Sequence, residues 1–271
     1  MKFKEYLRDY KFSEGIVDDA MDKIKDEPDE SELNDEDRTG FEDNRIRNAL
    51  SRIFGDNLEK LGAGNFSVVF SSPENSAEVI KVSNKVIDVK DDGYLHYINK
   101  IGKEIEENQN PYLPRVYDLE IYRGEEILPI SGQPISRYHY TLKLERLHMF
   151  ESKDYNAELY GDDSDNDPYS IANQLRIMVE KIYTEDGLGV FKERYNVTFN
   201  AFVRDLRKAI TIEDFSIIKD KNLIRAIRVL REAGGALESA VGMALYDIYQ
   251  QNIMFRRTPY GLQLVITDPL A

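Results

Sequence analysis

Residues 246–268 read YDIYQQNIMFRRTPYGLQLVITD, a loop followed by two apolar runs that flank a Pro-Tyr-Gly turn. Proline and glycine at those places suit a tight turn, so the runs 253–257 and 262–267 are predicted to pair as an antiparallel hairpin. Asn252 immediately precedes the first run, and Asp268 immediately follows the second. Pairing therefore brings these two oxygen-bearing side chains together at the open end of the hairpin.

These two side chains offer ligands that magnesium prefers. Mg²⁺ takes one or two carboxylate or amide oxygens from a protein and completes its shell with water and nucleotide phosphates. Asp247, five residues before Asn252, would then lie beside the metal, where it can accept or orient the hydroxyl proton of a phosphate acceptor. Taken singly, Asp247 and Asp268 are better explained as solvated turn carboxylates.

An earlier segment suits the binding of a polyphosphate. It runs Leu61-Gly62-Ala63-Gly64-Asn65-Phe66-Ser67-Val68-Val69, two glycines in a turn that leads into a strand. Glycine has no Cβ, so backbone amides can approach phosphate oxygens closely. The segment lacks the Gly-Lys-Ser/Thr of a Walker A loop, and alone a Gly-x-Gly turn is more often an ordinary hairpin.

A lysine follows in the next strand-like run, Ala77-Glu78-Val79-Ile80-Lys81-Val82. An ammonium fixed beneath the glycine segment can hold the α- and β-phosphates of ATP. Alone, Lys81 is equally well explained as an outward-facing strand residue. Taken together, the glycine turn, strand lysine, Asp-x-x-x-x-Asn loop and hairpin-terminal aspartate occur in the order of the protein-kinase signature. The combination predicts a protein-kinase-like fold.

The apolar pattern predicts an α+β chain in three parts. The N-terminal extension, residues 1–57, has two amphipathic helical patterns and an acidic stretch that buries too little apolar surface to become ordered. The acidic stretch is expected to be a linker, and the less favoured alternative is an element that binds a partner. Residues 58–150 show the alternation of an antiparallel sheet, with a helix at 94–107 that could pack on it. The N-terminal helical patterns are 12–24 and 46–54, the acidic linker is 26–42, and the expected strands are 66–70, 77–83, 115–122 and 137–146.

The third part, residues 151–271, is predicted to be a mostly helical lobe. An acidic, turn-rich loop opens it, and helical patterns occupy much of 169–245. The Gly234-Gly235 pair is expected to break or kink the last pattern before a second helical piece at 236–245. The chain ends three residues after Asp268, so we expect a minimal lobe without a conventional activation segment.

Composition indicates a globular and strongly acidic protein. Thirty-six Lys and Arg face fifty Asp and Glu, a formal charge of −14 that repels nucleic-acid phosphates and attracts basic partners. There is no cysteine, which excludes disulfides and Cys-based zinc sites. No apolar run approaches the ~18 residues of a membrane span. We therefore expect a protein of a reducing cytoplasm that binds neither nucleic acid nor membrane.

These motifs resemble those of the early serine/threonine protein kinase of teseptimavirus-type lytic bacteriophages. The resemblance is closest in LGAGNFSVVFSSP, VIKV, RVYD, YDIYQQNIMF and VITDP, which spread over residues 61–269. It implies a bilobal fold and phosphorylation of host proteins on Ser or Thr with ATP and Mg²⁺, together with autophosphorylation. The implied substrates are host transcription and translation machinery or defence factors, and the implied location is the host bacterial cytoplasm.

The resemblance also implies a role for each matching residue. Lys81 would be the phosphate-binding lysine, Asp247 the catalytic base, and Asn252 and Asp268 the metal ligands. The end of the last predicted strand, Glu145-Arg146-Leu147, would be the hinge whose backbone meets adenine. The nucleotide contacts implied in this way are Gly62, Ala63, Gly64, Asn65, Phe66, Ser67, Val69, Lys81, Glu145 and Leu147.

The chain also departs from cellular protein kinases. Ser67 replaces the third loop glycine, Leu245-Tyr246 replaces His-Arg, and Pro269-Leu270 replaces the Phe-Gly pair, but none of these changes removes a phosphate or metal ligand. Tyr249 stands two residues after Asp247, where serine/threonine kinases usually carry lysine, so the acceptor residue stays open. The acidic partner of the strand lysine also stays open among Asp91, Asp92 and Glu104.

Two other interpretations use the same residues. A small-molecule phosphotransferase of the aminoglycoside-kinase type shares all these motifs, but such enzymes normally add a large helical region after the metal-binding aspartate. A kinase-fold scaffold would instead bind and inhibit a host factor through its acidic surface. The joint presence of Lys81, Asp247, Asn252 and Asp268 argues against a decayed site.

Overall fold

The computed structural model describes most of the chain that follows the N-terminal extension. The described residues are 58–64, 67–83, 92–127, 134–156, 158–160, 169–194 and 197–270. The predicted helices at 12–24 and 46–54 and the acidic linker at 26–42 lie outside these ranges. Two compact units make up the chain. We call Met1–Val89 with Arg115–Arg146 the sheet unit, and Lys90–Pro114 with Leu147–Ala271 the helical unit.

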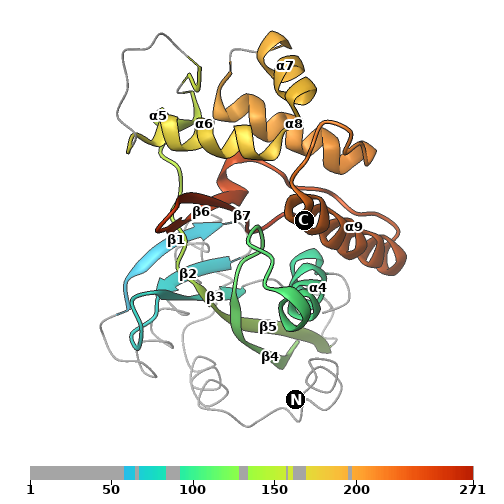
Figure 1. Cartoon of the computed structure of the whole chain (residues 1–271). Coiled ribbons are helices and arrows are strands. Elements are labelled where there is room, and N and C mark those ends of the chain that lie inside the picture. The colour runs from blue at the N-terminus through green and yellow to red at the C-terminus, as the bar shows by residue number, and fades with distance from the viewer. Residues whose placement is uncertain are drawn as a thin grey trace, which may run out of the picture. The chain divides into compact units, whose positions relative to one another are not determined.

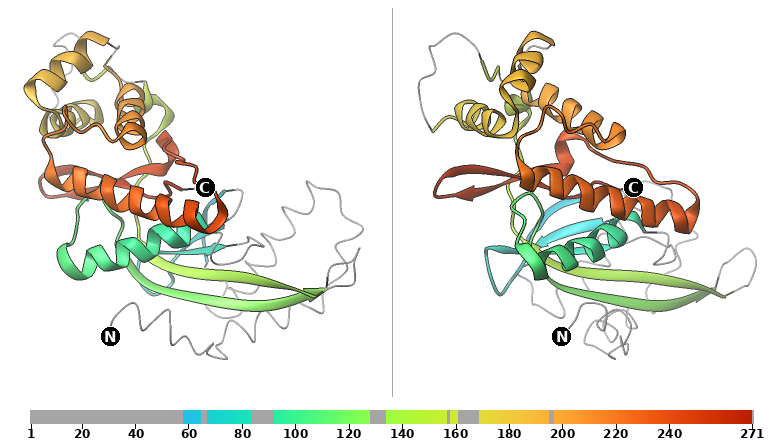
Figure 2. Two further views of the ribbon diagram at one scale, coloured as in Figure 1. Left: turned by 90° about the vertical axis from the view of Figure 1, so that its right-hand side faces the viewer. Right: turned by 45° about the vertical axis from the view of Figure 1, so that its right-hand side comes forward.

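The sheet unit contains one five-stranded sheet in the order β1-β2-β3-β5-β4, and every neighbouring pair is antiparallel. This confirms the predicted antiparallel sheet and the α+β class. In Figure 1 the five strands are labelled, and Figure 2 shows β4 and β5 as a long two-stranded ribbon. The strands are β1 (Lys60–Gly64), β2 (Ser67–Ser71), β3 (Glu78–Ser83), β4 (Val116–Ile127) and β5 (Pro134–Glu145).

The glycine segment is more regular than the sequence suggests. Gly62 and Gly64, which the sequence places in a turn, are residues of β1. β1 pairs with β2 up to Gly64 opposite Ser67, with one irregularity of register between Lys60 and Gly62. The prediction was wrong because backbone pairing with a neighbouring strand outweighs the weak strand preference of glycine.

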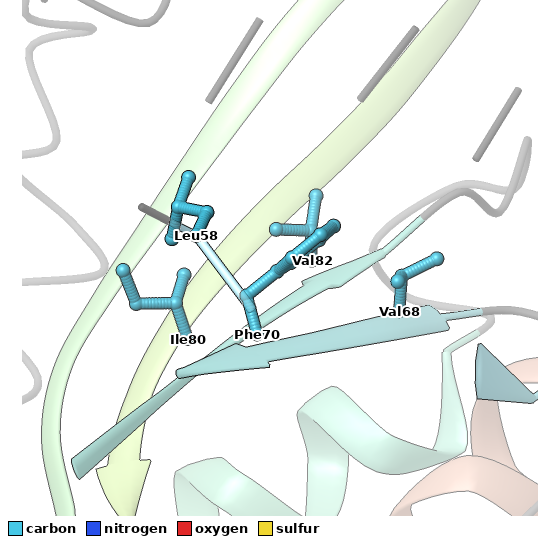
Figure 3. Close-up of a cluster of buried hydrophobic side chains, with 5 residues drawn as sticks. All are labelled: Leu58, Val68, Phe70, Ile80 and Val82. Carbon is cyan, nitrogen blue, oxygen red and sulfur yellow. The ribbon is translucent and has the colours of Figure 1, made fainter. Parts of the chain in front are cut away.

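One face of β2 and β3 carries a cluster of buried apolar side chains. Figure 3 shows its five members on the same side of these strands. They are Leu58, Val68, Phe70, Ile80 and Val82. Because side chains alternate along a strand, Val69 and Lys81 lie on the opposite face. The sheet therefore separates an apolar cluster from the face that carries the predicted phosphate-binding lysine.

The helical unit contains six α-helices, a short 3₁₀ turn and a hairpin among its described residues. Side chains of Asp92, Ser170, Thr198 and Asp220 accept hydrogen bonds from the first turns of four helices, which fixes where these helices begin. The elements are α4 (Gly93–Asn108), α5 (Ser152–Tyr155), α6 (Ile171–Ile182), α7 (Glu185–Arg194), α8 (Phe199–Ile212), α9 (Lys221–Val241), η4 (Gln250–Asn252), β6 (Ile253–Thr258) and β7 (Gly261–Ile266).

The predicted helix at 94–107 is confirmed as α4. It belongs to the helical unit and packs against α9, and Figure 2 shows these two helices side by side. Lys100 of α4 forms an ion pair with Glu232 of α9 at 3.2 Å. The α4–α9 pair therefore joins two segments that are far apart in the sequence.

The prediction of a break at Gly234-Gly235 is wrong. α9 runs through both glycines and ends at Val241, where Gly242 takes a left-handed conformation with φ of 82°. Ala233, Gly234 and Leu237 are buried, so packing on one face of the helix outweighs the intrinsic cost of glycine, which is about 1 kcal/mol per residue.

The predicted C-terminal hairpin is confirmed. β6 and β7 pair from Ile253 opposite Ile266 to Thr258 opposite Gly261. Gly261 has φ of 107°, a conformation that favours glycine. The Thr258 hydroxyl donates to the main-chain oxygen of Gly261 and accepts from the Tyr260 N–H. The open end of the hairpin thus lies between Asn252 and Thr267. Among the described residues, no helix combines the length and apolar character needed to cross a membrane.

Candidate functional site

The loop of residues 247–252, which we call the aspartate loop, is closed by its two end residues. Asn252 Nδ2 donates to the main-chain oxygen of Asp247 at 2.8 Å and to Asp247 Oδ2 at 2.9 Å. Both amide hydrogens are therefore used within the loop, and Oδ1 of Asn252 faces away from them. The amide oxygen is left available as a ligand.

Asp268 is held against this loop by hydrogen bonds of both its neighbours. The N–H and the Oγ1 of Thr267 donate to the main-chain oxygen of Asn252 at 2.9 and 3.0 Å. On the other side, the Asp247 N–H donates to the main-chain oxygen of Pro269 at 2.8 Å. The structure therefore brings together the three residues that the sequence predicts at this site, Asp247, Asn252 and Asp268.

A buried phenol supports the hairpin end from α4. The hydroxyl of Tyr97 donates to the main-chain oxygen of Ile266 at 2.7 Å, and its side chain is fully buried. Burial raises the pKa of Tyr97 well above its usual value, and the negative charge of Asp268 raises it further. Tyr97 thus remains a neutral donor beside the Asp268 carboxylate.

The donor set fits a magnesium ion that also binds a nucleotide. Asn252 offers an amide oxygen and Asp268 a carboxylate, both half-buried. Within the described ranges, no three His, Cys, Asp or Glu residues gather closely enough to hold a metal ion by themselves. Two protein oxygens with the rest supplied by phosphates and water is the usual arrangement for Mg²⁺.

Lys81 lies in a row of residues that crosses the sheet. Val69 of β2 is directly opposite Lys81, and Gly62 of β1 is directly opposite Val69. On the other side, Leu142 of β5 is opposite Lys81. Directly opposite residues in antiparallel strands project from the same face, so these predicted nucleotide contacts share one face with the lysine.

Lys81 does not behave as an ordinary surface lysine. Only 7% of the residue is exposed, whereas lysine is almost never buried without a partner for its charge. The outward-facing interpretation of this residue is therefore wrong. By contrast, Gly62 is exposed, and a Cβ on it would meet no atom within 4 Å. The described residues leave open space at this glycine.

The predicted hinge residues differ in their hydrogen bonding. Glu145 exchanges main-chain and side-chain bonds with Arg115, since its N–H donates to the Arg115 oxygen at 3.1 Å and its Oε1 accepts from the Arg115 N–H at 2.9 Å. The Arg146 N–H donates to Ala77 at 2.7 Å. Among the described residues, the Leu147 N–H has no hydrogen-bond partner. The carboxylate of Glu145 is thus structural, and Leu147 has a backbone donor to offer a base.

Of the three acidic residues considered as partners of Lys81, only the side chain of Asp92 is described by the structure. Asp92 is buried, and its Oδ1 accepts from the Leu95 N–H at 3.1 Å, so its carboxylate already caps the helix. Asp91 and the side chain of Glu104 lie outside the described residues, as do the predicted nucleotide contacts Asn65 and Phe66.

The sequence motifs do not indicate two residues that pack against the site, Tyr97 and Gly234. Tyr97 belongs to the buried stripe of α4, and its repeat with Tyr94, Ile98 and Ile101 gives a core signal but no sign of its bond to the hairpin. Gly234 makes room for the Tyr246 ring, which precedes Asp247. In both cases the link to the site is a contact between distant segments, which a local pattern does not reveal.

The predicted site residues thus form two groups, one in each unit. Gly62, Val69 and Lys81 share a face of the sheet unit, and the aspartate loop with Asp268 forms the second group in the helical unit. No protein-family model matches this chain, and a search of curated proteins found no match.

Proposed function

We propose that this chain is an ATP- and Mg²⁺-dependent protein kinase with a bilobal kinase-like fold, which transfers the γ-phosphate to Ser or Thr of host proteins and to itself. The observation that carries the proposal is the closed aspartate loop with Asp268 fixed beside it by Thr267 and Pro269. The phage-type motifs in residues 61–269 support a role in the infected bacterial cytoplasm.

The oxygen atoms of the site match the needs of phosphoryl transfer. Asp247 Oδ2 accepts from Asn252, while Oδ1 makes no hydrogen bond among the described residues. This oxygen can accept the proton of an acceptor hydroxyl as the hydroxyl attacks the γ-phosphorus. Mg²⁺, when bound, neutralises charge on the β- and γ-phosphates. Asn252 Oδ1 and the Asp268 carboxylate are the residues that would hold it.

The sheet unit supports the nucleotide-binding half of this proposal. The row Gly62, Val69, Lys81 combines a residue without a side chain, an apolar contact and a cation on one face. We propose that Lys81 binds the α- and β-phosphates and that the backbone of Leu147 meets adenine. A five-stranded antiparallel sheet, a helix between its third and fourth strands, and a hairpin-terminal aspartate suit a kinase-like fold.

The decisive experiment is transfer of labelled γ-phosphate from Mg²⁺-ATP. The purified chain and a bacterial lysate are the acceptors, and the unaltered chain is compared with Asp268→Ala. Asp186→Ala is the matched control, since Asp186 is an exposed aspartate in the first turn of α7. We expect label on lysate proteins with the unaltered chain and the control, and a loss of at least about 100-fold with Asp268→Ala.

Other outcomes identify the competing functions. Transfer to an aminoglycoside with no labelled protein would establish a small-molecule phosphotransferase. ATP binding without transfer, together with a full biological effect of Lys81→Ala, would establish a scaffold. Phosphoamino-acid analysis of the labelled proteins decides between Ser, Thr and Tyr acceptors.

A further inference from the structure

Helix α8 contacts the aspartate loop with side chains that no predicted motif includes. Gln250 Nε2 of the loop donates to Asn200 Oδ1 at 2.6 Å, and Asn200 Nδ2 donates to Asn156 Oδ1 at 2.8 Å. Figure 1 shows α8 among the helices of this unit. The first turn of α8 is therefore tied to the loop that carries Asp247.

A second contact follows two helical turns later. The guanidinium carbon of Arg207 lies 4.9 Å from the centroid of the Tyr249 ring. Seven residues separate Asn200 from Arg207, so both lie on one face of α8. Tyr249 is two residues after Asp247 and is 42% exposed, and Arg207 is also exposed. This face of α8 thus holds a cation beside the aspartate loop.

The aspartate loop itself supplies no positive charge. Its sequence, DIYQQN, contains neither Lys nor Arg. During phosphoryl transfer, negative charge spreads over the three non-bridging oxygens of the moving group, and a fixed cation beside them lowers the barrier. A guanidinium stacked on a ring still has its N–H edge free to donate to phosphate oxygens.

We propose that Arg207 is a further catalytic residue, which binds the phosphoryl group while it passes to the acceptor. The inference rests on the proposed kinase function. The bond between the γ-phosphorus and the bridging oxygen of ADP breaks, and ADP keeps the electron pair. The acceptor oxygen forms the new bond to phosphorus, and its proton passes to Asp247. Arg207 forms no covalent bond and donates hydrogen bonds throughout.

The test compares Arg207→Gln and Arg207→Lys with the unaltered chain in steady-state phosphate transfer. Arg228→Gln is the matched control, because Arg228 is an exposed arginine on α9 that lies 5.9 Å from the Phe215 ring. We expect Arg207→Gln to lower kcat by about 10- to 100-fold with little change in the KM for ATP. Arg207→Lys should retain part of the rate, and Arg228→Gln all of it.

Two rescue experiments separate a charge on phosphate from a merely structural stacking. Added guanidinium ion, at concentrations well below those that unfold the protein, should restore part of the rate of Arg207→Gln. Tyr249→Lys in the same variant should also raise the rate, because it places a cation within the loop. A structural role predicts neither rescue, and instead a lower melting temperature.

The outcomes separate this inference from the function on which it rests. If the unaltered chain transfers phosphate and Arg207→Gln does so at the same rate, only the role of Arg207 is overturned. The same holds if the rate falls together with stability and neither rescue works. If the unaltered chain transfers no phosphate, the proposed kinase function fails, and the inference fails with it.

Discussion

A methyl group added at Gly234 in α9 would collide with the ring of Tyr246. A Cβ built on Gly234 lies 2.5 Å from Tyr246 Oη, 2.9 Å from Cζ and 3.0 Å from Cε1. The next residue, Gly235, is exposed, and a Cβ there meets no atom within 4 Å. The two glycines therefore form a matched pair: an added methyl group would collide with a ring at Gly234 and would lie in open space at Gly235.

The change in the free energy of unfolding that each alanine causes is the sum of two opposing effects. Replacing a helical glycine by alanine stabilises the folded chain by roughly 1 kcal/mol, and Gly235→Ala should show this gain. At Gly234 the same gain is opposed by overpacking, which costs about 1–3 kcal/mol. The Tyr246 backbone bridges to Leu270, so the main chain that carries the ring is held in place, and the ring can yield only by rotating about its side-chain bonds. We expect Gly234→Ala to be about 0–2 kcal/mol less stable than the unaltered chain.

Thermal or urea unfolding measures this difference, and about 1 kcal/mol should change the melting temperature by roughly 2–4 °C. In a Tyr246→Ala background the collision disappears, so both alanine substitutions should stabilise equally. Because Tyr246 precedes Asp247, only Gly234→Ala should also slow phosphate transfer. Equal stabilisation by the two substitutions in the unaltered background would refute the reasoning.

Three further predictions concern the site. Lys81→Met should keep the fold, since methionine suits a buried position, but should lower labelled-phosphate transfer by about 100-fold or more; transfer at the normal rate would exclude a phosphate contact. Asn252→Ala removes a proposed metal ligand, so the Mg²⁺ concentration for half-maximal transfer should rise about tenfold, and an unchanged Mg²⁺ titration would contradict this role. The pKa of Tyr97 is raised from its usual 10.0, so the folded chain keeps a proton that the unfolded chain loses, and stability should fall as pH rises above about 10. Urea midpoints from about pH 9 to about pH 11 should fall less steeply for Tyr97→Phe, and parallel curves would show that Tyr97 does not contribute.

The C-terminal hairpin was predictable because its information is local. A Pro-Tyr-Gly turn between two apolar runs fixes the pairing of β6 with β7, and the pairing fixes where Asn252 and Asp268 lie. Local apolar patterns likewise predict α4 and the strand β5. For these elements, side-chain periodicity and turn chemistry agree with the tertiary contacts.

The remaining features depend on contacts between distant segments. α9 continues through Gly234, whose buried position lies against the Tyr246 ring, and this ring comes from the chain twelve residues later. The burial of Lys81 requires neighbours that no periodicity identifies, and the link of α8 to the aspartate loop depends on Asn200 and Arg207. Intrinsic preferences of glycine and lysine predict the opposite at Gly234 and Lys81, since tertiary packing overrides them.

The hydrogen bonds that place Asp268 beside the aspartate loop are formed largely by the peptide backbone. The Thr267 N–H donates to the Asn252 carbonyl, and the Asp247 N–H donates to the Pro269 carbonyl. A backbone bond of this kind does not depend on which side chain its residue carries, provided that the donor is not proline. Mutation can therefore replace many residues around this junction while three polar side chains keep their mutual position. The arrangement of the site thus tolerates more change in sequence around it than the identity of its three polar residues does.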